Sequence, residues 1–136
     1  MIARAALAAL AATLVAGCSG SSADDETSIR LVVPDKNVRA EGVECAGARP
    51  FHHVHEGAPF TIEAGDGTWV AGGTLPVGHA ENAEPGTDWG VDRIPTFCVL
   101  EFDIDLPERP RYRLRLGRGR PLEFVVGEEP VVLVVG

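Results

Sequence analysis

Residues 98–116 read CVLEFDIDLPERPRYRLRL, and this stretch decides the fold. Residues 98–106 alternate between two faces of a strand. One face carries Cys98, Leu100, Phe102 and the apolar residues that follow at every second position, and the opposite face is mostly acidic. After a turn at 107–110, apolar residues alternate with arginines in residues 112–116. A period of two residues is typical of a half-buried β-strand. The stretch therefore predicts two strands joined by a turn, each with one face toward a core.

Six arginines fall between positions 109 and 120. Such a stripe could bind an anionic ligand, but strand parity favours another interpretation. If the turn at 107–110 makes a hairpin, three of these arginines face acidic residues of the preceding strand, in the pairs Arg111–Asp105, Arg113–Asp103 and Arg115–Glu101. Opposite charges across a strand pair stabilise it by roughly 0.2–1 kcal/mol each. We therefore expect a neutralised ladder of ion pairs, with only Arg118 and Arg120 beyond it.

The chain from residue 29 onward shows the same β pattern. Apolar residues alternate in residues 29–33, and turn residues follow at 34–37. Gly65 and Gly67 lie between two further strand-like runs, and glycine accepts the positive φ of a tight hairpin turn. Residues 122–126 and 131–135 close the chain as two more strands. About six to eight short strands without helical periodicity predict an all-β protein, a small antiparallel β-sandwich.

The first 18 residues have the pattern of an export signal. A basic start up to Arg4 precedes an apolar run at 5–15, then small residues and Cys18. The run is shorter than the ~18 residues that a membrane span requires. The sequence Val15-Ala16-Gly17-Cys18 resembles a bacterial lipobox, which implies a lipoprotein signal peptide at 1–17 and a lipid on Cys18. An ordinary signal peptide cut near a cysteine is the alternative.

Lipidation implies an anchor in the cell membrane, since two or three acyl chains hold a protein there stably. The small, polar and acidic residues after Cys18 cannot form a core, and they predict a flexible tether at 18–28. The sandwich domain then takes residues 29–136 and lies on the extracytoplasmic face of the membrane.

Cys45 and Cys98 remain once Cys18 is assigned to lipid. An extracytoplasmic compartment permits disulfides, and two cysteines there predict one bridge. Closing a loop of about 54 residues stabilises a fold by ~4 kcal/mol on the chain-entropy account. A thiolate metal ligand or a nucleophile is the alternative, but neither cysteine has a Cys-x-x-Cys or Cys-His signature beside it.

The order of these features resembles a family of small secreted or lipid-anchored actinobacterial proteins. It runs from Cys45 through the Gly65-Asp66-Gly67 turn and a strand ending in Gly-Thr-Leu to the strands of residues 98–116. The resemblance covers residues 45–135 and implies an immunoglobulin-like or transthyretin-like sandwich. Such folds host many unrelated roles, so the resemblance implies no particular function.

Charge and motifs narrow the classes of function. The net charge is −8, and loss of Arg4 with the signal leaves 11 basic against 20 acidic residues, or −9. This balance argues against nucleic acid as a partner. No Gly-x-Ser-x-Gly, His-Glu-x-x-His, Ser-x-x-Lys or phosphate-loop motif occurs, and no serine follows position 28. We therefore expect a protein that is not an enzyme.

Three of the four histidines, His52, His53 and His55, lie close together next to Glu56. If residues 51–55 are extended, His53 and His55 share a face, and neutral imidazoles suit Zn(II) or Cu(II). The hairpin at 65–67 returns the chain toward them, which makes His79 the candidate further ligand. Unliganded histidines in a solvated loop are the alternative.

Residues 76–96 form a long predicted loop that contains three prolines and Trp89. Connections of this length tend to be either functional or disordered. Trp89 is a candidate recognition anchor, because aromatic residues dominate binding hot spots; packing on the sandwich edge is the alternative.

The leading prediction for the whole protein is a cell-surface lipoprotein that acts as a non-enzymatic binding module and engages an envelope protein. The alternative is an extracytoplasmic Zn- or Cu-binding lipoprotein.

Overall fold

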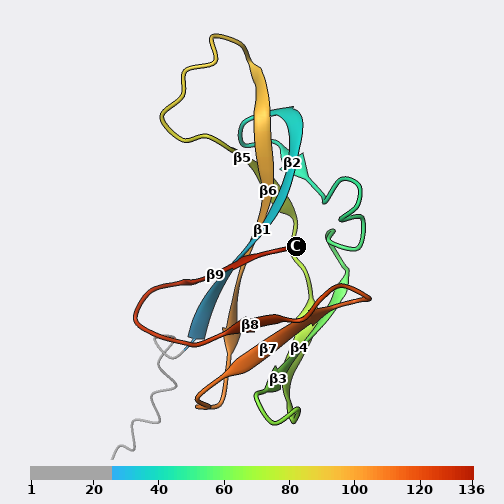
Figure 1. The fold of residues 1–136 in the computed structure, drawn as a ribbon, viewed down its shortest axis with the longest axis vertical. Helices are drawn as coiled ribbons and strands as arrows, with labels where there is room; N and C mark the ends of the chain where they lie inside the picture. Colours follow the sequence, from blue (N-terminus) through green and yellow to red (C-terminus); the bar gives the residue numbers. More distant parts are fainter. Residues whose placement is uncertain (1–25) are drawn as a thin grey trace, which may run out of the picture.

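The computed structural model describes residues 26–136, which form two packed β-sheets (Figure 1). The five-stranded sheet has the order β2 (Glu44–Cys45), β5 (Gly78–Asn82), β6 (Arg93–Asp105), β1 (Glu26–Ala40) and β9 (Val131–Val134). The four-stranded sheet has the order β4 (Trp69–Thr74), β3 (Pro59–Ala64), β7 (Tyr112–Leu116) and β8 (Leu122–Phe124). The predicted all-β sandwich is confirmed. Cys18 and the signal peptide at 1–17 lie outside the described residues.

The core lies between the sheets and is built from the alternating positions that the sequence predicts. Ile29, Leu31 and Val33 of β1 pack against Leu100 of β6 and Leu114 of β7, and each is at most 1% exposed. Residues 26–136 include no helix that could cross a membrane. Every residue of the buried core cluster lies between positions 29 and 135. A chain of residues 19–136 therefore contains this whole core cluster.

The hairpin predicted at Gly65 to Gly67 is confirmed as the β3–β4 connection. Gly67 has a φ of +90°, a conformation that side-chain-bearing residues rarely adopt. Its amide donates to the Ala64 carbonyl oxygen at 2.9 Å and closes the turn.

The hairpin predicted between the two strands of residues 98–116 is wrong. β6 pairs with β1 and β5, whereas β7 pairs with β3 and β8 in the other sheet. The connection between them crosses from one sheet to the other. The Tyr112 hydroxyl fixes this crossing, since it donates to the Pro107 carbonyl oxygen at 2.5 Å and accepts from the Arg109 amide at 2.9 Å.

The predicted ladder of ion pairs is wrong for the same reason, because its two sides lie in different sheets. Arg113 instead pairs with Glu123 of β8 at 3.1 Å, and Arg115 pairs with Glu63 of β3 at 3.0 Å. On the other sheet, Glu101 pairs with Arg30 of β1. Glu101, Arg113 and Arg115 are therefore neutralised by other partners, whereas Asp103, Asp105 and Arg111 make no ion pair within residues 26–136.

Strand β1 differs from the prediction in three ways. It begins at Glu26, three residues before the predicted start of the domain at residue 29. It continues through residues 34–37, where a bulge interrupts the register with β6 in place of the predicted turn. It also pairs with β9 in parallel, so the sandwich is antiparallel except at this edge.

The long loop predicted at 76–96 is also wrong over much of its length. Residues Gly78–Asn82 form β5, which pairs with β6, and β6 itself begins at Arg93. Only residues 83–92 remain as a connection between the two strands. The polar and glycine-containing sequence of β5, GHAEN, lacks the alternation by which the other strands were predicted.

Candidate functional site: an arm and its tip loop

One end of the five-stranded sheet extends beyond the four-stranded sheet as an arm, at the top of Figure 1. We define the arm as residues 37–44 and 79–97. None of its residues belongs to the main core cluster. Ala80, Ile94 and Thr96 are nevertheless buried on its inner side. Because the arm lacks a second sheet to pack against, it depends on specific bonds at its base.

The first of these bonds is the disulfide between Cys45 and Cys98, which confirms the predicted pairing. It joins β2 to β6, although β5 lies between them in the sheet. The bridge passes close to Gly78: a Cβ at this position would lie 2.7 Å from the Cys98 Sγ and 2.9 Å from the Cys45 carbonyl oxygen. A residue without a side chain is therefore required in β5 beneath the bridge.

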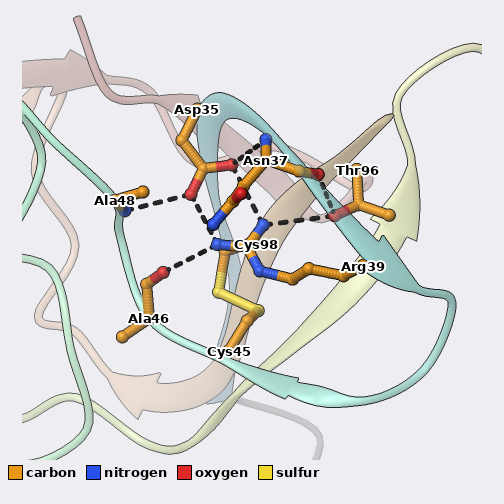
Figure 2. The surroundings of a disulfide bond; sticks show 8 residues. All are labelled: Asp35, Asn37, Arg39, Cys45, Ala46, Ala48, Thr96 and Cys98. Carbon is orange, nitrogen blue, oxygen red and sulfur yellow. Dashed lines mark hydrogen bonds and ion pairs between the residues drawn. A yellow bond between two sulfur atoms is a disulfide. The ribbon is translucent and has the colours of Figure 1, made fainter. Parts of the chain in front are cut away.

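The second bond at the base is a buried ion pair beside the disulfide (Figure 2). The Asp35 side chain is 0% exposed and lies in the bulge of β1. Its carboxylate accepts two hydrogen bonds from the Arg39 guanidinium, at 2.8 and 3.1 Å, and others from the Ala48 and Asn37 amides at 3.0 and 3.2 Å. Burial alone would raise the pKa of Asp35, but these donors outweigh it, so the pKa lies below its ordinary value.

The Arg39 guanidinium extends this cluster to the neighbouring segments. It donates to the Ala46 carbonyl oxygen and to the Thr96 hydroxyl, each at 3.1 Å, and the Thr96 hydroxyl donates to the Asn37 carbonyl oxygen at 3.0 Å. The cluster thus joins β1, β6 and the segment after β2. The sequence did not reveal this cluster, because residues 34–37 were predicted to form a turn and Asp35 was expected to lie in it.

Residues 83–92, the tip loop, connect β5 to β6 at the end of the arm. The Asn82 side-chain oxygen accepts hydrogen bonds from the Glu84 amide at 2.9 Å and from the Trp89 indole N–H at 3.4 Å. The Ala83 amide donates to the Pro95 carbonyl oxygen at 3.0 Å. These bonds hold the tip loop in one conformation and leave Trp89 only partly exposed.

The exposed groups of the tip loop combine carboxylates with apolar surface. Glu84, Asp88 and Asp92 are exposed, and the Val91 side chain is 64% exposed next to the partly exposed Trp89. A tryptophan and an aliphatic residue within a charged rim are typical of protein-binding surfaces. Asn82, which organises this loop, was not identified from the sequence, and neither was Trp69, which is 64% exposed on the edge strand β4.

The predicted histidine cluster is arranged differently from the expectation. Residues 51–54 form a turn, closed by a hydrogen bond from the Val54 amide to the Phe51 carbonyl oxygen at 3.0 Å, so the extended conformation under which His53 and His55 would share a face does not occur. His79 lies in β5, opposite Val99 of β6. Within residues 26–136 no group of three or more histidine, cysteine or acidic side chains is arranged to hold a metal ion. Binding of Zn(II) or Cu(II) by His52, His53, His55 and His79 stays a prediction.

Replacing Asn82 by alanine is expected to loosen the tip loop, because the Glu84 amide and the Trp89 indole both lose their acceptor. We expect a stability loss of about 1 kcal/mol and a red shift of the Trp89 emission in a Trp69→Phe background. Asn82→Asp, which keeps the acceptor oxygen, is the matched control. Unchanged emission and unchanged acrylamide quenching in Asn82→Ala would show that the bond does not position Trp89.

Comparisons with protein-family models, with curated proteins and with solved structures found no match for this chain.

Proposed function

We propose that this protein is a non-enzymatic binding module of the cell envelope, and that the tip loop contacts its partner. The N-terminal sequence supports a place at the membrane, because Val15-Ala16-Gly17-Cys18 resembles a lipobox and the residues after Cys18 suit a tether. The partner that fits the loop is a protein surface with an apolar recess for Trp89 and Val91 and a basic rim for the carboxylates around them.

The observation that carries this proposal is the position of the tip loop on the molecule. Glu26 pairs with Asp105 at one end of β1, and Ala40 pairs with Arg93 at the other end. The tip loop follows β5 at this second end, so it lies at the opposite end of β1 from the proposed anchor. Fifteen residues of strand span about 50 Å at ~3.3 Å per residue. This geometry suits a module that presents its contact surface away from the membrane.

The proposal of a non-enzymatic role is supported by the hydrogen bonding of the buried polar groups. Residues 26–136 contain no buried side-chain nitrogen or oxygen atom that lacks a hydrogen-bond partner. The carboxylate of Asp35, whose side chain is 0% exposed, accepts four hydrogen bonds within the cluster at the base of the arm. Enzymes commonly hold a titratable group with a strongly perturbed pKa in a cleft. Here the pKa of the buried Asp35 carboxylate is lowered, and this group is occupied in a structural ion pair.

Site-specific photocrosslinking in the producing cell tests this proposal. A photoreactive amino acid at Thr87, in the exposed tip loop, is expected to give a discrete adduct, and Trp89→Ala in the same chain is expected to reduce its yield about tenfold or more. The matched control carries the same group at Glu128, an exposed residue of the β8–β9 connection near the start of β1. Equal adducts at both positions, or an adduct at Thr87 that is insensitive to Trp89→Ala, would refute the assignment.

A further inference from the structure

Two segments far apart in the sequence meet on one side of the sandwich, at the right of Figure 1: the loop of residues 46–58 and the β7–β8 turn of residues 117–121. The His53 ring lies against the turn. A Cβ at Gly119 would lie 2.9 Å from the His53 Nε2 and 3.1 Å from the Leu116 carbonyl oxygen. The absence of a side chain at Gly119 therefore allows the imidazole to approach the backbone of the turn.

The two segments that meet here also carry exposed arginines. Arg118 and Arg120 flank Gly119 in the turn, and both are exposed. Arg49 is exposed in the opposing loop, whose residues 47–54 are closed by a hydrogen bond from the Gly47 amide to the Val54 carbonyl oxygen at 2.8 Å. His52 is exposed in the turn of residues 51–54, which belongs to the same loop. We call this set the basic surface; its members are Arg49, His52, His53, Arg118 and Arg120.

The three arginines of the basic surface are free to bind a ligand. Within residues 26–136, Arg30, Arg39, Arg113 and Arg115 form ion pairs, whereas Arg49, Arg118 and Arg120 form none. The acidic residues nearest in sequence are Glu56 and Glu123. The Glu56 carboxylate is in no ion pair, and the Glu123 carboxylate pairs with Arg113 at 3.1 Å. On a chain with a net charge of −8, this is a local concentration of positive charge.

We propose that the basic surface binds the phosphate groups of a linear anionic polymer. Guanidinium groups match the geometry of phosphate oxygens and donate charge-assisted hydrogen bonds to them. A narrow chain can contact the basic surface alone. The β6–β7 crossing follows Asp105, the strand partner of Glu26, so the β7–β8 turn lies at the end of β7 away from the start of β1 and from the proposed membrane anchor. The polymer is therefore favoured over a membrane surface.

This site is separate from the tip loop and does not depend on the partner proposed there. Its two segments belong to the connections after β2 and β7, whereas the tip loop connects β5 to β6. The sequence had singled out Arg118 and Arg120 as the arginines beyond the expected ladder, but it linked the histidines to His79. The structure instead places the turn that carries these arginines against His53.

Calorimetric titration of residues 19–136 with long-chain inorganic polyphosphate at low ionic strength tests the proposal. We expect saturable binding that weakens as salt is added. Arg118→Ala with Arg120→Ala is expected to weaken it about tenfold or more. Arg109→Ala with Arg111→Ala changes the net charge equally at exposed positions on the other connection of β7, and it is expected to change the affinity less than about twofold.

Three results would overturn the proposal. The first is equal weakening by both pairs of substitutions, which would show a nonspecific charge effect. The second is no binding of polyphosphate, with unchanged melting curves showing that all variants are folded. The third is binding to phosphatidylglycerol vesicles without binding to polyphosphate, which would assign the basic surface to a membrane instead.

Discussion

Replacing Cys45 and Cys98 together by alanine is expected to lower the free energy of unfolding by about 4 kcal/mol. The bridge closes 53 residues of chain, and its loss enlarges the conformational freedom of the unfolded state. It also removes the covalent link between β2 and β6 at the base of the arm. Since a domain of this size has a total stability of about 5–15 kcal/mol, this is the largest single effect that we expect. Chemical denaturation followed by tryptophan fluorescence measures it.

Chemical reduction of the wild-type protein is the matched control for this variant. Reduction breaks the bond but keeps both sulfur atoms, and Cys98 is 0% exposed, so the alanine variant also leaves a cavity. We expect the reduced protein to lose most of the same stability and the alanine variant to lose slightly more. A loss below about 1 kcal/mol in both cases would contradict the structural role of the bridge.

Replacing Asp35 by alanine is expected to cost about 3 kcal/mol. The change leaves the Arg39 guanidinium, whose side chain is only 11% exposed, without its carboxylate, and it removes the acceptor of the Ala48 and Asn37 amides. Asp35→Asn keeps one acceptor oxygen and should cost less. Asp92→Ala, at an exposed position of the tip loop, is the matched control and should change stability by less than about 0.5 kcal/mol. Equal effects at Asp35 and Asp92 would contradict the account.

The same carboxylate predicts a dependence of stability on pH. The pKa of Asp35 is lower in the folded protein than in the unfolded chain, so near pH 4 the unfolded chain binds more protons. The stability that Asp35 contributes is therefore complete above about pH 4 and is lost as the pH falls further. Unfolding measured between pH 3 and pH 7 should show a steeper acid loss for the wild type than for Asp35→Asn. Parallel curves would contradict this prediction.

The sequence predicts which residues face the core, because alternation depends only on the local geometry of a strand. Leu31, Leu100 and Leu114 were placed inward on this basis and are 0% exposed. The disulfide was also predictable, since only Cys45 and Cys98 remain after the lipobox. Alternation does not reveal which strand lies beside which. The sequence therefore suggested a hairpin where the Tyr112 hydroxyl instead holds a crossing between the sheets.

The candidate site was less predictable, because it depends on contacts between distant segments. Trp89 was identified as the aromatic residue of a polar predicted loop. Its hydrogen bond to Asn82 could not be predicted, because strand β5, which positions Asn82, was not recognised in the sequence. The Asp35 cluster joins residues 35, 39 and 96, which the register of β1 with β6 brings together, to residue 48 in the segment after β2. The position of His53 against Gly119 likewise depends on where the β7–β8 turn falls. No local sequence pattern predicts these contacts between distant segments.

The central claim is that the arm is an ordered extension which holds the tip loop in place. Hydrogen–deuterium exchange tests it most directly, because the Gly42, Ala80 and Ala83 amides donate within the arm to the Ala80, Val43 and Pro95 carbonyl oxygens. We predict that these three amides are strongly protected in the wild type and lose protection in Asp35→Ala, while Leu100 and Leu114 in the sandwich remain protected. Exchange of the three amides at the rate of an unfolded chain in the wild type would contradict the account.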